Sequence, residues 1–174
     1  GIEKYDREGR VLLTEHDGFL LYNIYFPNGQ KDDVRLQYKL DFYDDLLPII
    51  NEQVESDNNV IVTGDWNTAH FPIDLARPKE NIRTSGFMPV ERERLDTYVD
   101  NGWVDTFRLF HPEPHRYSWW SYRMGARDRN IGWRIDYFFV NGSFAESCLD
   151  ADIHDDVMGS DHCPISLSIE NDSS

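Results

Sequence analysis

Two polar side chains follow the end of a short apolar run. Residues 60–67 have the sequence VIVTGDWN, so branched residues lead into Gly64 and then to Asp65 and Asn67. Open sheets gather ligand-binding groups at the carboxyl ends of their strands, and residues two apart in extended backbone face the same side. A carboxylate suits a hard cation or a polarised water, and an amide suits a phosphate oxygen. The sequence predicts one site for both, with an Asx turn that closes the strand as the structural alternative.

A histidine and an aspartate precede the last apolar run. Residues 159–164 have the sequence GSDHCP and place Asp161 directly before His162. Histidine is the usual acid or base near neutral pH, and a carboxylate commonly orients its ring. Neighbouring side chains in extended backbone face opposite sides, so we expect a remote partner; Asp136 is the candidate, because a charge at the start of the apolar run IDYFFV needs one. The structural alternative is a surface loop beside a salt-bridged strand start.

A stretch rich in arginine and aromatic residues lies between these two segments. Residues 113–134 carry five arginines among three tryptophans and two tyrosines, with only Glu113 and Asp128 as acids. Arginine guanidinium groups bind phosphates, and aromatic rings stack on bases or line a pocket. The stretch therefore predicts a segment that contacts nucleic acid. The alternative is that the aromatic rings belong to the core and the arginines pair with the protein's many acids. A phenol and an amide also lie where a predicted strand ends in a tight turn, at Tyr25 and Asn28.

Alternating strands and two helices are expected to position these groups. Strands are predicted over residues 19–26, 60–62, 104–110, 118–122, 135–140 and 165–169. Helices are predicted over residues 34–55 and 89–102, the first of them capped by Asp32 or Asp33. Pro48 predicts a kink or a break near Leu47. This alternation predicts an α/β or layered α+β fold in one domain over residues 1–170, with a disordered tail over residues 171–174.

Composition narrows the class of protein. The 174 residues are 40% hydrophobic, which supports one real core, and no apolar run approaches the roughly 20 residues of a membrane span. The N-terminus is polar and is not a signal peptide. Cys148 and Cys163 form no CxxC pair and no disulfide framework, which predicts two buried thiols and fits a reducing cytoplasm. The formal net charge of −15 argues against a generic DNA-coating protein, because phosphate contacts need lysine and arginine.

Taken in chain order, the segments resemble the exonuclease III/AP endonuclease family of the endonuclease–exonuclease–phosphatase superfamily. The pieces that carry the resemblance are IYFPNG (24–29), GDWN (64–67), YSWWSYR (117–123), GWRIDYFFV (132–140) and GSDHCPI (159–165). The resemblance implies part of a four-layer sandwich, with mixed and mainly antiparallel sheet flanked by helices. It implies a DNA-repair phosphodiesterase that depends on Mg²⁺ or Mn²⁺ and acts on double-stranded DNA at abasic sites or 3′ ends.

The resemblance also implies a role for each residue around the reacting phosphate. Asp65 matches the aspartate that positions or deprotonates the attacking water, and Asn67 matches the asparagine beside it that contacts the phosphate. His162 matches the histidine that binds the scissile phosphate or assists proton transfer, and Asp136 matches the carboxylate that orients it. Asp161 matches a carboxylate linked to metal binding, with Asp65 and Asn67 as further candidate ligands.

A second set of residues is implied in contact with DNA. Tyr25 matches a residue whose hydroxyl assists at the phosphate, and Asn28 lies near the phosphate and the flipped sugar. Trp119 and Trp133 match the walls of the abasic pocket. The arginine-rich stretch supplies the remaining candidates for DNA contact, Arg123 and Arg127.

The resemblance lacks the family's first part, which carries an asparagine in an early strand and the glutamate that is the principal Mg²⁺ ligand. We therefore expect an incomplete metal site and an apolar sheet face that a homodimer covers. Two other functions stay open. A catalytically impaired DNA-binding remnant is favoured by the missing glutamate, whereas a phosphatase for lipid or nucleotide substrates is disfavoured by the arginines and stacked tryptophans.

Overall fold

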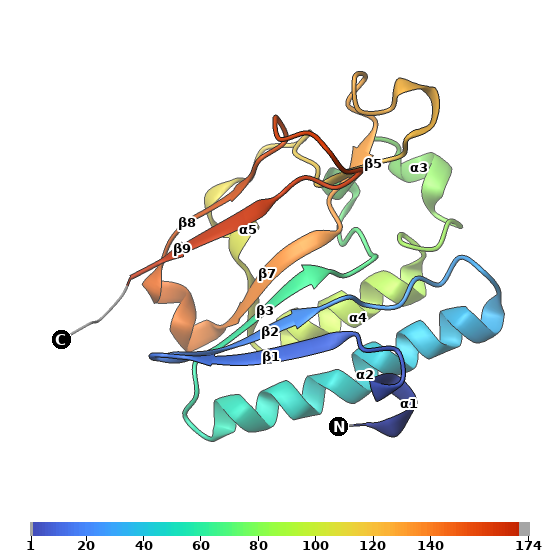
Figure 1. Cartoon of the computed structure of the whole chain (residues 1–174). Coiled ribbons are helices and arrows are strands. Elements are labelled where there is room, and N and C mark those ends of the chain that lie inside the picture. Colours follow the sequence, from blue (N-terminus) through green and yellow to red (C-terminus); the bar gives the residue numbers. More distant parts are fainter. Residues whose placement is uncertain (1, 171–174) are drawn as a thin grey trace.

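The computed structural model describes residues 2–170, whose helices and strands form successive layers (Figure 1). The predicted tail, residues 171–174, lies outside the described residues. The central sheet has five strands in the order β1-β2-β3-β7-β4. Its strands are β1 (Val11–His16), β2 (Phe19–Ile24), β3 (Val60–Asp65), β7 (Asp136–Asn141) and β4 (Trp103–Asp105). Pairing is parallel between β2 and β3 and antiparallel elsewhere, so the predicted mixed, mainly antiparallel sheet is confirmed.

Two long helices cover one face of this sheet, α2 (Asp33–Glu55) and α4 (Pro89–Asp100). Asp32 caps α2, as predicted, by accepting a hydrogen bond of 2.8 Å from the Arg35 N–H. Apolar residues at helical spacing along α2 are buried, since Leu40, Tyr43, Leu47 and Ile50 all lie in the core. The helix runs through Pro48 without the break that the proline suggested.

A β-hairpin covers part of the opposite face of the sheet. It consists of β8 (Cys148–Ile153) and β9 (Ile165–Ile169), which follow the 3₁₀ helix η3 (Gly142–Ser147). Its apolar side chains pack on those of the central sheet, where Ile61 and Val140 are buried. Figure 1 shows the hairpin above β7, away from the helical layer. The molecule is therefore helices, sheet and hairpin in three successive layers.

Short elements complete the chain. They are α1 (Glu3–Asp6), η1 (Pro72–Asp74), α3 (Pro78–Asn81), α5 (Thr106–Phe110), β5 (Trp119–Trp120), η2 (Arg123–Gly125) and β6 (Gly132–Trp133). Strands β5 and β6 pair antiparallel and face Trp119 with Trp133. The two tryptophans predicted to form a wall are thereby neighbours in one small sheet.

Two predicted strands were wrong, and two strands were missed. The strand predicted over residues 104–110 ends at Asp105 and gives way to helix α5, because Thr106 turns inward and donates a hydrogen bond of 2.9 Å to the Phe138 carbonyl. The strand predicted over residues 118–122 contains only two residues. Strands β1 and β8 were not predicted; their half-exposed faces give a weak alternation of apolar and polar residues.

Two predictions about the chain's environment can be compared with the structure. None of the helices within residues 2–170 is both long enough and apolar enough to cross a membrane. Cys148 and Cys163 are free and buried, as predicted.

Candidate active site

The carboxyl end of β3 presents Asp65 and Asn67 together, held by a network of short contacts. The Asn67 backbone N–H donates to Asp65 Oδ1 at 2.8 Å, and Asn67 Nδ2 donates to Asp65 Oδ2 at 3.0 Å and to the Phe26 carbonyl at 2.9 Å. Asn28 Nδ2 donates to Asn67 Oδ1 at 2.9 Å. Gly64 makes this approach possible, since a Cβ there would lie 2.0 Å from the Ile24 carbonyl oxygen. The predicted pair is thus fixed relative to the turn that carries Asn28.

A second network orients His162. Its Nδ1 lies 2.9 Å from Asp136 Oδ2, and the Ser118 hydroxyl donates to the same oxygen at 2.6 Å. Ser118 Oγ also accepts the backbone N–H groups of Ile135 and Asp136, each at 3.1 Å. The remote carboxylate predicted for His162 is therefore in place, with a buried hydroxyl that holds it. Asp136 is also directly opposite Asp65 in the β3–β7 ladder, so the two networks share one end of the sheet.

Burial and neighbouring charges set the protonation of both networks. Burial and the charge of Asp136 raise the pKa of Asp65, the Asn67 N–H opposes them, and the net value is about 7. Burial alone would lower the pKa of His162, but the hydrogen bond and charge of Asp136 outweigh it and raise that pKa above its usual value. A carboxyl group that titrates near neutral pH thus lies beside an imidazole biased toward its charged form.

One groove of about 870 Å³ gathers most of the residues predicted from sequence. Those that line it are Tyr25, Asn28, Asp65, Asn67, Trp119, Arg123, Trp133, Asp161 and His162. Trp119 and Trp133 meet edge to face with ring centroids 6.5 Å apart, and Trp119 Nε1 donates to Asp161 Oδ2 at 3.0 Å. A paired acid and amide, a histidine and an aromatic wall therefore face one space.

Two predicted residues do not line the groove. Asp136 lies behind His162 and acts on the groove through that ring. Arg127 lies over the Trp120 ring and donates to the backbone carbonyls of Ser160, Asp155 and Val157. Its guanidinium thus anchors the loop before His162, whereas the sequence had suggested direct contact with DNA.

Several residues at the site were missed from sequence. Ser118 orients Asp136, and its position just before the aromatic pair was the available signal. Lys39 donates to the Asn67 carbonyl at 2.7 Å from the middle of α2, where a lysine normally indicates a solvated position. Arg77, Asn81 and the segment 84–86 also line the groove. They come from the short helix α3 and the residues around it, where no extended helical or strand periodicity marks the sequence.

The ligand set for a divalent cation is incomplete. Within residues 2–170, no three histidine, cysteine, aspartate or glutamate side chains cluster as a metal would require. Asp65 directs both oxygens to Asn67, and Asp161 directs Oδ2 to Trp119. A hard cation such as Mg²⁺ prefers several oxygen ligands, and the described residues bring no such cluster together.

Comparisons with known proteins agree in pointing to one family. A model of the Endonuclease/Exonuclease/phosphatase family matches residues 1–162. An exodeoxyribonuclease of Bacillus subtilis (strain 168) is 46% identical over 170 residues, which are 97% of this chain and 67% of that protein. A DNA-(apurinic or apyrimidinic site) endonuclease of Dictyostelium discoideum is 39% identical over 173 residues, which are 98% of this chain and 48% of that protein.

Solved structures resemble this one over nearly its whole length. An AP endonuclease from Archaeoglobus fulgidus superposes with a TM-score of 0.84 at 27% sequence identity, over 94% of this chain and 66% of that one. A 3′–5′ exonuclease from Neisseria meningitidis gives 0.87 at 26% identity, over 92% and 65%. The chain spans about half to two thirds of the length of these relatives.

Proposed function

The chain belongs to the endonuclease/exonuclease/phosphatase family, and we propose that it hydrolyses phosphodiester bonds in double-stranded DNA as a repair nuclease. The relatives are named as exodeoxyribonucleases and abasic-site endonucleases, which supports DNA as the substrate. One observation carries the proposal: the Asp65–Asn67 pair and His162, which Asp136 orients from behind, face one groove beside Trp119. Phosphodiester hydrolysis needs an aligned nucleophile and neutralised phosphoryl oxygens, which these two pairs supply.

Each side chain then has a separate task. Asp65, with its pKa near 7, accepts a proton from the attacking water and aligns it with the scissile P–O bond. His162 directs Nε2 at a non-bridging oxygen and donates to it as imidazolium, steadied at Nδ1 by Asp136. Asn67 already gives both amide hydrogens to protein oxygens, so contact with the phosphate exchanges one of these bonds for another. Tyr25 and Asn28 lie on the adjoining wall and are assigned to the same phosphate.

The groove also suits an abasic sugar. Trp119 and Trp133 form an aromatic wall at the end of the groove that holds His162. A nucleotide without its base loses less stacking when it leaves the duplex, so such a wall favours abasic sites. Arg123 lines the same space and is assigned to a DNA phosphate. Cleavage at abasic sites and removal of nucleotides from 3′ ends are both proposed for this groove.

Mg²⁺ or Mn²⁺ is the proposed cofactor, with Asp161, Asp65 and Asn67 as partial ligands. Since the described residues form no complete cation site, the steps above use only the chain's own groups. We expect the isolated chain to need millimolar metal, because affinity for such cations falls with ligand number.

A second copy of the chain is proposed as a partner, and the cytoplasm as the compartment. Val11, Leu12 and Leu13 of the outermost strand β1 are 45%, 60% and 48% exposed, an apolar run that association would cover. Light scattering at high concentration tests this, and a purely monomeric chain would contradict it. The two buried free thiols agree with a reducing compartment.

A DNA-binding remnant without catalysis is the second candidate, favoured by the incomplete cation site. One experiment separates the two functions: a duplex with a single abasic analogue is incubated with the chain, with and without Mg²⁺ or Mn²⁺, beside His162→Ala. Metal-dependent cleavage that the variant lacks supports the nuclease. Binding without cleavage by both proteins supports the remnant.

A further inference from the structure

A fully buried ion pair lies directly behind the groove. Lys39 of α2 and Glu91 of α4 have no exposed side-chain surface, and the ammonium lies 2.6 Å from Glu91 Oε1. Buried ion pairs are on balance no more stabilising than apolar residues of the same volume, whereas removal of one partner is strongly destabilising. Net stabilisation therefore does not explain this pair, and its role is inferred from its hydrogen bonds to other groups.

The ammonium holds the back of a site residue. Lys39 Nζ donates to the Asn67 backbone carbonyl at 2.7 Å, while the Asn67 side chain faces the groove. Asn67 has a φ of 53°, in the left-handed region that asparagine adopts more readily than most residues. A fixed donor to this carbonyl stabilises that backbone conformation, which in turn orients the side-chain amide.

The Glu91 carboxylate holds the segment 85–88, which lies next to Trp133. Glu91 accepts hydrogen bonds from Ser85 Oγ at 2.8 Å, from the Gly86 N–H at 2.6 Å and from the Met88 N–H at 3.1 Å. Gly86 packs directly on the indole of Trp133, since a Cβ on this glycine would lie 3.3 Å from Trp133 Cζ3. Glu91 therefore places the segment 85–88 against the aromatic wall.

We propose that Lys39 is a positioning residue whose ammonium joins Asn67 to the segment 85–88 through Glu91, and so sets the spacing between the Asn67 amide and the Trp133 wall. The inference rests on the proposed hydrolysis in the groove. It assigns Lys39 no contact with DNA, because the side chain is fully buried. A substitution of Lys39 should therefore alter how bound DNA is aligned in the groove, while the residues that contact the DNA stay in place.

Three variants separate positioning from stability. Lys39→Met/Glu91→Gln removes both charges, keeps an amide oxygen for the Gly86 and Met88 N–H groups, and deletes the donor to Asn67. Glu91→Gln alone keeps that donor. Arg94→Met is the matched control, because Arg94 joins α4 to α2 through Asp44 at 3.0 Å on the exposed side of the same two helices.

The readouts are the melting temperature, kcat and KM on a duplex with one abasic analogue, and the NMR signals of the Asn67 side-chain amide. We expect the double variant to lose about tenfold to a hundredfold in kcat with KM within about threefold, since small misplacements of a positioning group act on the chemical step. Its Asn67 signals should shift. Glu91→Gln, which weakens the same link from its other end, should lose kcat in the same direction by a smaller factor and shift the Asn67 signals, whereas Arg94→Met should match the unsubstituted chain.

An unchanged kcat and unmoved Asn67 signals in the folded double variant would overturn the assignment. If that variant does not fold, Glu91→Gln decides: unchanged kcat and unmoved Asn67 signals below its melting temperature overturn the assignment, because the link to the segment 85–88 is then weakened without effect. If the unsubstituted chain cleaves no DNA, the proposed function fails, and the NMR comparison still tests Lys39 by itself.

Discussion

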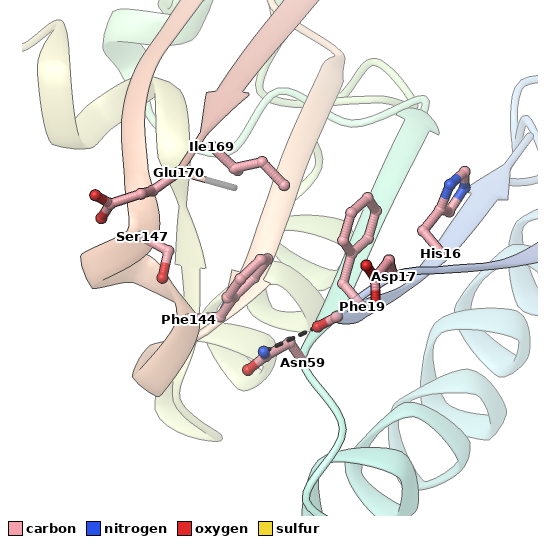
Figure 2. A pocket seen from close by; sticks show the side chains of 9 residues that line it. His16, Asp17, Phe19, Asn59, Phe144, Ser147, Ile169 and Glu170 are labelled. Carbon is pink, nitrogen blue, oxygen red and sulfur yellow. Dashed lines mark hydrogen bonds between the residues drawn. The ribbon is translucent and has the colours of Figure 1, made fainter. Parts of the chain in front are cut away.

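Two hollows lie at opposite ends of the same strands, and they differ in how their side chains are connected. The groove with Asp65 and His162 lies where β2 and β3 end and β7 begins. The other hollow, of about 510 Å³, lies where β2 and β3 begin, beside Phe19, Asn59 and Phe144 (Figure 2). Both are open spaces lined by polar and aromatic groups, so the space alone does not distinguish them.

The connections between side chains do distinguish them. In the groove, Asn28, Asn67 and Asp65 form one chain of hydrogen bonds, and Ser118, Asp136 and His162 form another. Around the other hollow, the only side-chain hydrogen bond between two lining residues within residues 2–170 joins Asn59 Nδ2 to the Gly18 carbonyl at 3.0 Å. Catalysis depends on groups fixed before the substrate arrives, so the connected hollow is the candidate site.

The sharpest test of this comparison substitutes alanine for one histidine in each hollow and compares the two cleavage rates. His162→Ala should lower the rate of abasic-site cleavage by about a thousandfold, because general acid–base and charge-donating groups typically contribute 10²–10⁴-fold. His16→Ala, in the other hollow, should leave the rate within about twofold, since surface changes away from a site act weakly. Cleavage of a labelled duplex under single-turnover conditions measures both. Equal losses would remove the distinction between the two hollows.

Asp74 tests how much the buried ion pairs with Arg134 and Arg108 contribute to the stability of the fold. This buried carboxylate lies 2.8 Å from Arg134 Nε and 2.5 Å from Arg108 Nη2, so Asp74→Asn should destabilise the fold by about 3–5 kcal/mol. Glu170→Gln at the other hollow should change stability by less than about 0.5 kcal/mol. Urea unfolding followed by fluorescence measures both changes. A small loss in Asp74→Asn would show that the network is dispensable.

The same carboxylate predicts a dependence on pH. Burial would raise the pKa of Asp74, but the charges of Arg134 and Arg108 outweigh it and hold that pKa below the usual 3.8. A carboxylate with a depressed folded-state pKa stabilises fully above its unfolded value, and this stabilisation is lost as pH falls through the folded value. The unsubstituted chain should therefore lose its advantage over Asp74→Asn below about pH 4. A constant difference between pH 7 and pH 3 would argue against the ion pairs.

A substitution of Phe144, in the hollow beside Phe19 and Asn59, should change stability without changing activity. Phe144→Ala should destabilise the protein by about 3 kcal/mol, because the ring is only 7% exposed and packs between sheet and hairpin. Below the melting temperature its cleavage rate should equal that of the unsubstituted chain. A large loss of kcat in the folded variant would connect this hollow to the chemistry and break the comparison.

Ser118 gives the smallest expected effect. Ser118→Ala removes the donor to Asp136 and the acceptor for two backbone N–H groups, so stability should fall by about 1–3 kcal/mol. Cleavage should fall about tenfold, since His162 loses part of its alignment. Ser147→Ala at the other hollow is the control, with no change expected in either quantity. A rate unaffected by Ser118→Ala would mean that Asp136 orients His162 without help.

The sequence predicted the site better than it predicted the elements between its parts. Asp65, Asn67 and His162 follow or precede strongly apolar strands, and the rule that strands end at a common edge was enough to bring them together. Asp136 was found because a charge entering an apolar strand needs a partner. The short helix α5 was missed and the strand before it was drawn too long, since apolar residues over 104–110 fit a strand and a helix equally well.

Residues that act through backbone contacts escaped the sequence analysis. Arg127 was grouped with arginines that bind phosphate, yet it donates to three carbonyls of the loop before His162. Lys39 carries no motif, and only the fold shows its ammonium beneath Asn67. Patterns of residue type identify side chains that meet a ligand, whereas partners on the main chain depend on the tertiary arrangement.

A crystal structure with a duplex that carries a non-cleavable abasic analogue tests the central claim most directly. The account predicts the phosphate beside the abasic sugar at about 2.7–3.2 Å from His162 Nε2, with the sugar against Trp119 and Trp133. A phosphate bound outside this groove, with the imidazole still turned only toward Asp136, would contradict it.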